Sequence, residues 1–228
     1  MDNLTILTVN FNTPDYIYAL VKSLHKYASW YKKPLIVVDN STRKVLPQGN
    51  ACGMDVVYFD THNYSVLQAL PKSRYAAAGN YNSAHHSITI DWAIKNLVKT
   101  PYVLLVDSDI VFTRDFRSNY DLFVSGGYAL AGYKRTQYAC PTIAPWCCFI
   151  NVKKMVELGL SYFDFNRILY VNDNLTHDTG ASLYEDFKKH NLPVLETPDN
   201  LFWLHFKGGS VFKDKGIAWL VRNSQYWR

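Results

Sequence analysis

The sequence has no dense run of lysine or arginine, although its formal net charge is +5 and its isoelectric point is about 8.9. Chains that wrap nucleic acid concentrate their basic residues, whereas spread positive charge favours anionic ligands only diffusely. The composition therefore leaves nucleic acid open as a partner without requiring it. The sequence also lacks repeats, linkers and low-complexity segments, so we expect a single domain over 1–228.

Signals for membranes and secretion are lacking as well. No apolar stretch approaches the roughly 20 residues that cross a bilayer, and the chain opens with Asp2 and Asn3, unlike a signal peptide. The four cysteines, none with metal-binding spacing, are Cys52, Cys140, Cys147 and Cys148. We expect reduced thiols, no transmembrane segment and a cytoplasmic location.

The first half of the chain does contain buried-type strands that alternate with a helix. Residues 4–10 are a β-branched run, and residues 35–39 form an apolar strand. Between them, Thr13 and Pro14 provide an N-cap and a first position for a helix over 16–27. This β-α-β order predicts a mostly parallel central sheet covered by helices. The further expected elements are strands at 54–59, 102–106, 128–133, 147–152, 193–196 and 201–206, and helices at 88–98, 153–158 and 180–189.

The sharpest motif is Asp107-Ser108-Asp109, which directly follows the apolar run YVLLV. Ligands of open α/β sheets bind at the carboxyl ends of the strands, where both carboxylates would lie. Mg²⁺ and Mn²⁺ take oxygen ligands, commonly one or two carboxylates completed by substrate phosphates and water. The motif therefore predicts that Asp107 and Asp109 bind a divalent metal. The alternative is that both aspartates cap the turn that follows.

The order of three segments resembles glycosyltransferase family 2, a family of inverting enzymes with the GT-A fold. The segments are TVNFNTPDYIYALVKSL, LIVVDNST and YVLLVDSD. The resemblance implies an α/β, Rossmann-like GT-A domain, with a mostly parallel sheet flanked by helices. Its nucleotide-binding half would span about 1–112 and its acceptor-binding half about 113–228. It also implies that Thr8 and Asn10 line a nucleoside pocket and that Asp39 accepts a hydrogen bond from the base.

The segment AAAGNYNSAHH, residues 76–86, is similar to the family segment that precedes the helix leading to the metal motif. By this likeness Asn80 and Asn82 would bind the base or the diphosphate, and Arg74 would pair with phosphate. The alternative is that both asparagines cap a loop. Adjacent histidines seldom serve one metal ion well, so we expect His85-His86 to be surface or capping residues.

A late histidine lies in the segment LHFKGGS, 96 residues after Asp109. Many GT-A enzymes supply a late histidine as a further metal ligand, which implies this role for His205. Imidazole suits Mn²⁺ better than Mg²⁺, so Mn²⁺ is the expected cofactor and Mg²⁺ the alternative. Lys207 would place positive charge against the diphosphate, which the neighbouring glycines would let the backbone approach.

Direct displacement also needs a base for the acceptor hydroxyl, and the segment YVNDNLTHDTG offers two aspartates. Asp178 precedes a Thr-Gly turn and a helix, which resembles the placement of the catalytic carboxylate in similar enzymes. Most of the family has an acidic residue just before it, whereas this chain has His177. We expect Asp178 to be the general base, with Asp173 as the alternative; Asp178 could equally cap the helix.

These features together predict a metal-dependent hexosyl- or pentosyltransferase. It would move a sugar from a nucleoside-diphosphate sugar, with a UDP-sugar favoured, to a glycan or another hydroxyl-bearing acceptor, with inversion. A nucleotidyltransferase is the first alternative, but residues 10–15 (NFNTPD) lack the glycines and basic residues that hold a triphosphate. A non-catalytic carbohydrate- or nucleic-acid-binding module is the second, in which the aromatic residues would be stacking platforms.

Overall fold

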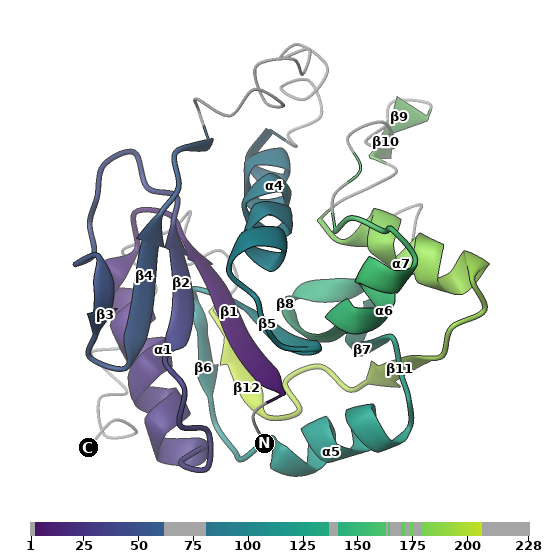
Figure 1. Ribbon diagram of the computed structural model, residues 1–228, viewed down its shortest axis with the longest axis horizontal. Helices are drawn as coiled ribbons and strands as arrows, with labels where there is room; N and C mark the ends of the chain where they lie inside the picture. Colours follow the sequence, from purple (N-terminus) through teal and green to yellow (C-terminus); the bar gives the residue numbers. More distant parts are fainter. Residues whose placement is uncertain are drawn as a thin grey trace.

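The computed structural model describes residues 3–61, 81–136, 141–162, 164, 170–171, 174–175 and 179–206. Its centre is an eight-stranded sheet (Figure 1). In spatial order its strands are β11 (Val194–Thr197), β7 (Leu130–Arg135), β8 (Thr142–Asn151), β5 (Tyr102–Asp107), β1 (Leu4–Asn10), β2 (Leu35–Asp39), β4 (Met54–Tyr58) and β3 (Gly49–Ala51). Four of the seven pairings are parallel, which confirms the predicted mostly parallel sheet.

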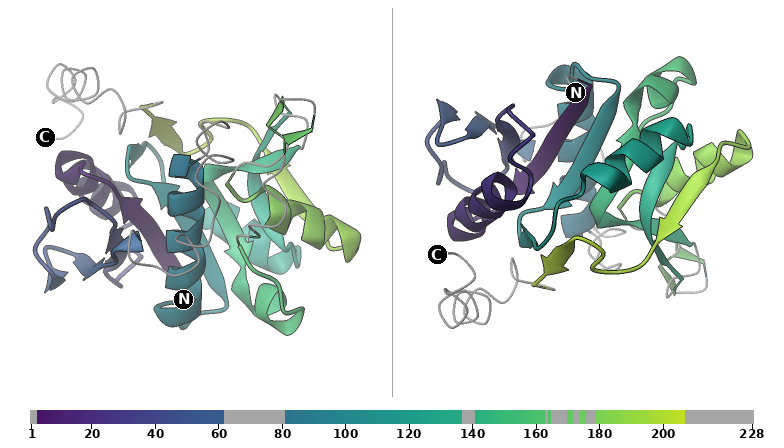
Figure 2. Two further views of the ribbon diagram at one scale, coloured as in Figure 1. Left: turned by 90° about the horizontal axis from the view of Figure 1, so that it is seen from above. Right: turned by 90° about the horizontal axis from the view of Figure 1, so that it is seen from below.

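Helices cover both faces of the sheet, and α1 and α4 lie on opposite sides of it (Figure 2). Side chains of α1 (Pro14–Tyr27) and α5 (Arg117–Ser125) join one core cluster, which includes Leu4 and Ile6 of β1. The opposite cluster contains Leu7 and Val9 of β1. It is completed by α4 (Tyr81–Asn96), α6 (Val152–Glu157) and α7 (Ala181–Lys189). Burial on both faces explains why β1 places apolar residues on each of its two faces and is buried at every position.

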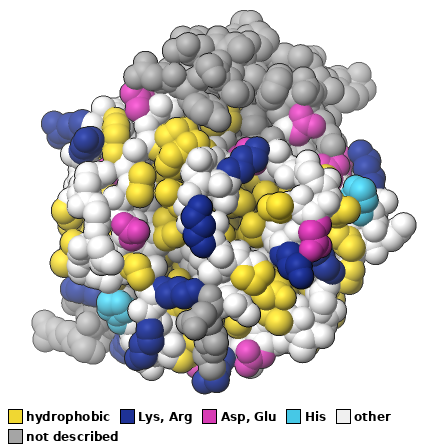
Figure 3. Space-filling view, in the orientation of Figure 1, with side chains coloured by type: hydrophobic (Ala, Val, Ile, Leu, Met, Phe, Trp, Pro, Cys, Tyr) yellow, Lys and Arg dark blue, Asp and Glu magenta, His cyan; other side chains and the backbone are white. Residues whose placement is uncertain are grey.

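Two short antiparallel pairs flank the main sheet. β6 (Ile110–Phe112) pairs with β12 (Trp203–His205), and β9 (Tyr170–Val171) pairs with β10 (Asn174–Leu175). The first pair ties a late segment of the chain to the residues just after β5. On the face seen in Figure 3, Lys and Arg side chains are scattered among apolar and acidic ones, in line with the diffuse charge expected from the sequence.

Several predicted boundaries differ from those observed. The helix predicted over 88–98 begins earlier, at Tyr81, and α5 was not predicted at all. Thr13 does occupy the N-cap position of α1, but its side chain makes no capping hydrogen bond. Its hydroxyl instead donates to Asn10 Oδ1 at 3.0 Å, so that the helix start is tied to the end of β1.

Candidate metal and nucleotide site

The carboxyl ends of β1, β2, β4 and β5 meet at one edge of the sheet, because these four strands run parallel. β5 ends in Asp107, and the turn that follows it brings Asp109 to the same edge before β6 begins. Asp109 is buried, with 4% of its surface exposed, whereas Asp107 is half-buried. A buried carboxylate needs donors or cations around it to offset the loss of water.

The pairing of β12 with β6 brings His205 to these carboxylates. His205 lies opposite Ile110 in that pairing, and the Phe206 amide donates to the Asp109 carbonyl at 3.0 Å. His205 Nε2 then lies 3.1 Å from Asp109 Oδ1 and 4.0 Å from Asp107 Oδ2. One ligand atom from each of the three residues falls within 4.8 Å of the others. The predicted cluster of two aspartates and a histidine is therefore assembled.

The neighbouring carboxylates change the pKa of His205. Burial lowers the pKa of His205, but the hydrogen bond from the imidazole to Asp109 and the charges of Asp109, Asp107 and Asp199 outweigh burial. The pKa of His205 is therefore raised above its ordinary value. A raised pKa favours the charged imidazolium form beside the two carboxylates.

The start of α1 forms a second layer behind Asp109. The Thr13 and Ser108 hydroxyls lie 3.3 Å apart. The Tyr16 hydroxyl is buried and has no hydrogen-bond partner among the described residues. Burial, followed by the charge of Asp109, raises the pKa of Tyr16, so the phenol keeps its proton. It is therefore a hydrogen-bond donor close to the cluster.

His86 was missed as a site residue. The sequence-based expectation placed His85-His86 on the surface or at a cap, but α4 turns His86 towards the two aspartates, with Nε2 3.7 Å from Asp107 Oδ1. His85 is buried, and its Nδ1 lies 2.7 Å from the Thr61 hydroxyl. The expectation failed because adjacent residues on a helix point about 100° apart, so one can be buried while the next faces the site.

Asp39 lies at the end of β2, fully buried. Its Oδ1 accepts hydrogen bonds from Asn10 Nδ2 at 2.9 Å and from the Ser41 amide and hydroxyl, and its Oδ2 accepts from the Val45 amide at 3.2 Å. These donors shape the loop that follows β2. A base could reach this carboxylate only as a further donor to Oδ2, so the predicted base contact stays a prediction.

Thr8 and Asn10, predicted to line a nucleoside pocket, are fully buried on the face of β1 that α1 covers, since alternate residues of a strand share a face with Ile6. Their contact with a nucleoside stays a prediction. The Asn10 amide group donates to Asp39 and Ser41, and its oxygen accepts from the amide and hydroxyl of Thr13. Asn10 is thus saturated by bonds within the chain.

Phe11 is the exposed aromatic side chain that follows β1, with 44% of its surface exposed at this edge. Its exposure is unusual for a large apolar residue beside a buried strand, and sequence reasoning did not single it out.

Five predicted residues lie outside the described residues: Arg74, Asn80, Asp173, Asp178 and Lys207. Asn82 lies in the first turn of α4, but its side chain is not among those described.

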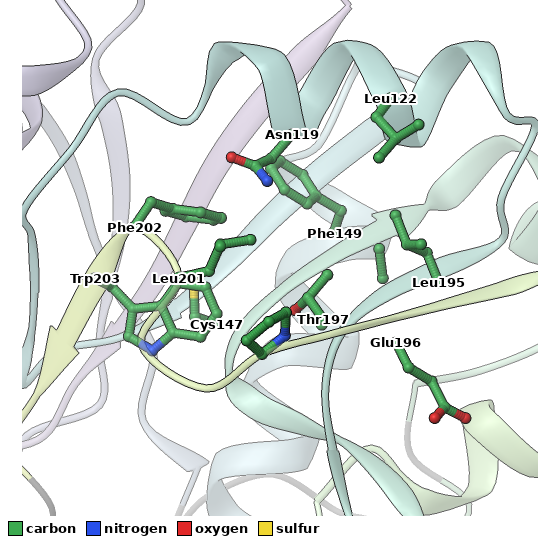
Figure 4. A pocket seen from close by; sticks show the side chains of 13 residues that line it. Asn119, Leu122, Cys147, Phe149, Leu195, Glu196, Thr197, Leu201, Phe202 and Trp203 are labelled. Atoms are coloured by element: carbon green, nitrogen blue, oxygen red, sulfur yellow. The ribbon is translucent and has the colours of Figure 1, made fainter.

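A cavity of about 210 Å³ lies on the α5 side of the sheet, between α5, β7, β11 and residues 201–203 (Figure 4). Its wall includes Cys147 and Trp203, but Asp107, Asp109 and His205 do not line it. It is therefore distinct from the cluster that these three residues form. Among the described helices, none is long and apolar enough to cross a membrane.

No protein-family model and no curated protein sequence matches the chain. Solved structures do. TarS of S. aureus, residues 1–349, superposes with a TM-score of 0.53 at 13% identity, over 92% of this chain and 62% of TarS. The galactosyltransferase LgtC, solved with donor and acceptor sugar analogs, superposes with a TM-score of 0.54 at 16% identity, over 85% of this chain and 73% of LgtC.

The mannosyltransferase PcManGT of Pyrobaculum calidifontis, solved with GDP-Man and Mn²⁺, gives a TM-score of 0.55 at 10% identity, over 86% of this chain and 55% of PcManGT. The chain spans less than two thirds of TarS and of PcManGT. At these identities the likeness establishes the fold, and the predicted GT-A glycosyltransferase fold is confirmed.

Proposed function

We propose that this GT-A protein is a metal-dependent glycosyltransferase that moves a sugar from a nucleoside-diphosphate sugar, with a UDP-sugar favoured, to an acceptor hydroxyl. One observation carries the proposal. Asp107, Asp109 and His205 come from the end of one strand, a turn and a distant strand, yet their ligand atoms lie within 4.8 Å of one another. Their position at the carboxyl edge of the sheet is where open α/β sheets bind ligands.

The donor set fits a divalent transition metal. Two carboxylates suit Mg²⁺ and Mn²⁺ alike, and the imidazole favours Mn²⁺. A metal bound there would neutralise the negative charge that grows on the diphosphate leaving group. In this proposal Asp107, Asp109 and His205 would hold the metal, and His205 would bind it as the neutral imidazole.

The surrounding side chains would bind and orient the diphosphate. The protonated Tyr16 hydroxyl is a donor without a partner among the described residues, and His86 lies beside Asp107. The half-buried His86 side chain can donate to a phosphate oxygen once the nucleotide is bound, whereas the buried Tyr16 hydroxyl would act within the protein near Asp109. Arg74 and Lys207 remain proposed phosphate contacts on the strength of the family resemblance.

The nucleoside would lie over the ends of β1 and β2. Phe11 offers an exposed ring at that edge on which a base can stack. Asp39 remains the proposed selector of the base, through Oδ2, while it also anchors the loop. Asn80 is retained as a proposed contact to the base or diphosphate.

Asp178 is the proposed general base, with Asp173 as the alternative. A single displacement in which this carboxylate takes the proton of the acceptor hydroxyl would invert the anomeric centre. The acceptor would be a glycan or another hydroxyl-bearing molecule bound by the second half of the chain. Nothing in the cluster favours the nucleotidyltransferase or the binding-module alternative.

A thermal-shift panel tests the proposal. The melting temperature is measured with UDP, GDP, ADP, CDP and UTP, each with and without Mn²⁺. We expect one nucleoside diphosphate, UDP first, to raise the melting temperature only when Mn²⁺ is present, because the metal bridges protein and diphosphate. Stabilisation by UTP alone would favour a nucleotidyltransferase, and stabilisation by none of the nucleotides would contradict the proposal.

A further inference from the structure

Within the part of the chain that the structure describes, His205 lacks the second hydrogen bond that usually orients a metal-binding histidine. Such a histidine nearly always donates its second ring nitrogen to a carboxylate, carbonyl or water, and this bond fixes the orientation of the ring. Here Nε2 faces Asp109, whereas Nδ1 is buried and has no hydrogen-bond partner among the described residues. The backbone pairing of β12 places the residue, but it leaves rotation about the side-chain bonds unrestrained. Apart from the Nε2 contact with Asp109, no hydrogen bond within the described residues fixes the imidazole plane.

Trp146 provides a contact of another kind. It lies in β8, one residue before Cys147, which pairs with Val106 at the end of β5. Trp146 is therefore beside Asp107 at the carboxyl edge of the sheet. Its ring stacks on the imidazole of His205, with the ring centroids 5.2 Å apart and an interplanar angle of 28°. An aromatic ring stacked at this distance restricts the rotamers that His205 can adopt.

Trp146 is itself held from a third strand. The Arg135 guanidinium of β7 lies 5.0 Å from the centroid of the Trp146 ring, and the Tyr133 ring lies 6.2 Å away. Arg135 is buried, so its cation–π contact is shielded from water and correspondingly stronger. A row of contacts thus runs from β7 through Trp146 to His205 and on to Asp109.

We propose that Trp146 is a positioning residue: by stacking, it holds the His205 imidazole in the orientation needed to bind the metal beside Asp107 and Asp109. The inference rests on the metal site of the proposed function. It assigns to one side chain of the second half of the chain a role that a hydrogen bond usually fills. Because Trp146 Nε1 has no hydrogen-bond partner among the described residues, Trp146→Phe keeps a stacking ring and breaks no hydrogen bond within them.

The first test measures Mn²⁺ affinity of the full chain from the electron paramagnetic resonance signal of free Mn²⁺. Trp146→Phe should bind Mn²⁺ within about threefold of the wild type, and Trp146→Leu about 10- to 100-fold more weakly, as for the loss of other orienting partners. Trp30→Leu is the control and should bind Mn²⁺ like the wild type, since Trp30 is also half-buried and stacked, on Tyr120, and additionally donates a hydrogen bond to Asp115. Wild-type affinity in Trp146→Leu, or equal losses in Trp146→Phe and Trp146→Leu, would overturn the proposal.

The second test needs no metal. The ring current of Trp146 should shift the imidazole Hε1 resonance of His205, which is identified among the seven histidines by its loss in His205→Ala. We expect the resonance to move in Trp146→Leu and to stay close to its place in Trp30→Leu. If it does not move in Trp146→Leu, the stacking inference is wrong. If it moves but the wild type binds no Mn²⁺, the stacking holds and the proposed metal site is what fails.

Discussion

Replacing Asp39 with alanine is expected to destabilise the fold, even though sequence reasoning singled this residue out for a contact with the base. Asp39 is fully buried, and its carboxylate accepts four hydrogen bonds. Two of the donors can adapt: the Asn10 amide still donates to the Ser41 hydroxyl oxygen, and the Ser41 hydroxyl can rotate its proton towards another acceptor. The other two are the backbone amides of Ser41 and Val45, which cannot rotate towards water.

Leaving a buried donor unpaired costs about 1–3 kcal/mol, so two such amides amount to roughly 3 kcal/mol of unfolding free energy. Asp39→Asn keeps one carbonyl oxygen and should lose only about 1–2 kcal/mol. Urea unfolding followed by circular dichroism measures both losses. Asp121→Ala, an exposed change in α5, is the control and should shift the free energy by less than about 0.5 kcal/mol.

A loss below about 1 kcal/mol in Asp39→Ala would refute this account of the loop. The folded Asp39→Asn variant then separates anchoring from base recognition. If Asp39 also reads the base, calorimetry should show weaker nucleotide binding in Asp39→Asn under conditions where it is fully folded. Unchanged affinity for every base would leave Asp39 with the anchoring role alone.

Three further predictions concern other residues. Phe11→Ala should weaken nucleoside diphosphate binding by about 10-fold or more in calorimetry while Phe11→Tyr keeps it, since stacking on a base contributes about 1–3 kcal/mol; equal affinity in both variants would remove Phe11 from the site. Asp178→Asn should lower turnover by about 10²–10⁴-fold with substrate binding nearly unchanged, and a loss in Asp173→Asn instead would move the base there. Burial raises the pKa of both Cys147 and Cys148, which keeps them thiols, so peptide mapping after brief alkylation of the native protein at pH 8 should find exposed Cys52 modified and these two intact.

The elements that sequence reasoning located best are those set by local signals. The strand over 4–10 and the strand over 35–39 have the observed bounds, since each is rich in apolar or β-branched residues and is closed by polar or turn residues. Pro14 marked the start of α1 for the same reason. The carboxylates of the metal cluster were predictable because a buried strand delivers them to the edge of the sheet. His205 was found through family resemblance, as only folding brings it to Asp109.

The parts that escaped sequence reasoning depend on how elements rotate and pack. β1 is buried at every position, so its sequence does not reveal that Thr8 and Asn10 share the face under α1. His86 reaches Asp107 only through the rotation of α4 about its own axis. α5 has no side-chain cap at its start, so the sequence carries no capping signal from which this helix could be predicted. The stacking of Trp146 on His205 joins two strands that are distant in sequence, which no local pattern records.

The central claim is that Asp107, Asp109 and His205 bind the divalent metal that holds a nucleoside diphosphate. Isothermal titration of UDP into the wild type and into Asp109→Asn, each with Mn²⁺ and with EDTA, tests it most directly, with Asp121→Asn as the control. We expect wild-type and control proteins to bind UDP only with Mn²⁺, and Asp109→Asn to lose at least about 10-fold in affinity because a buried metal ligand is gone. Mn²⁺-dependent binding of wild-type strength in Asp109→Asn would contradict the account.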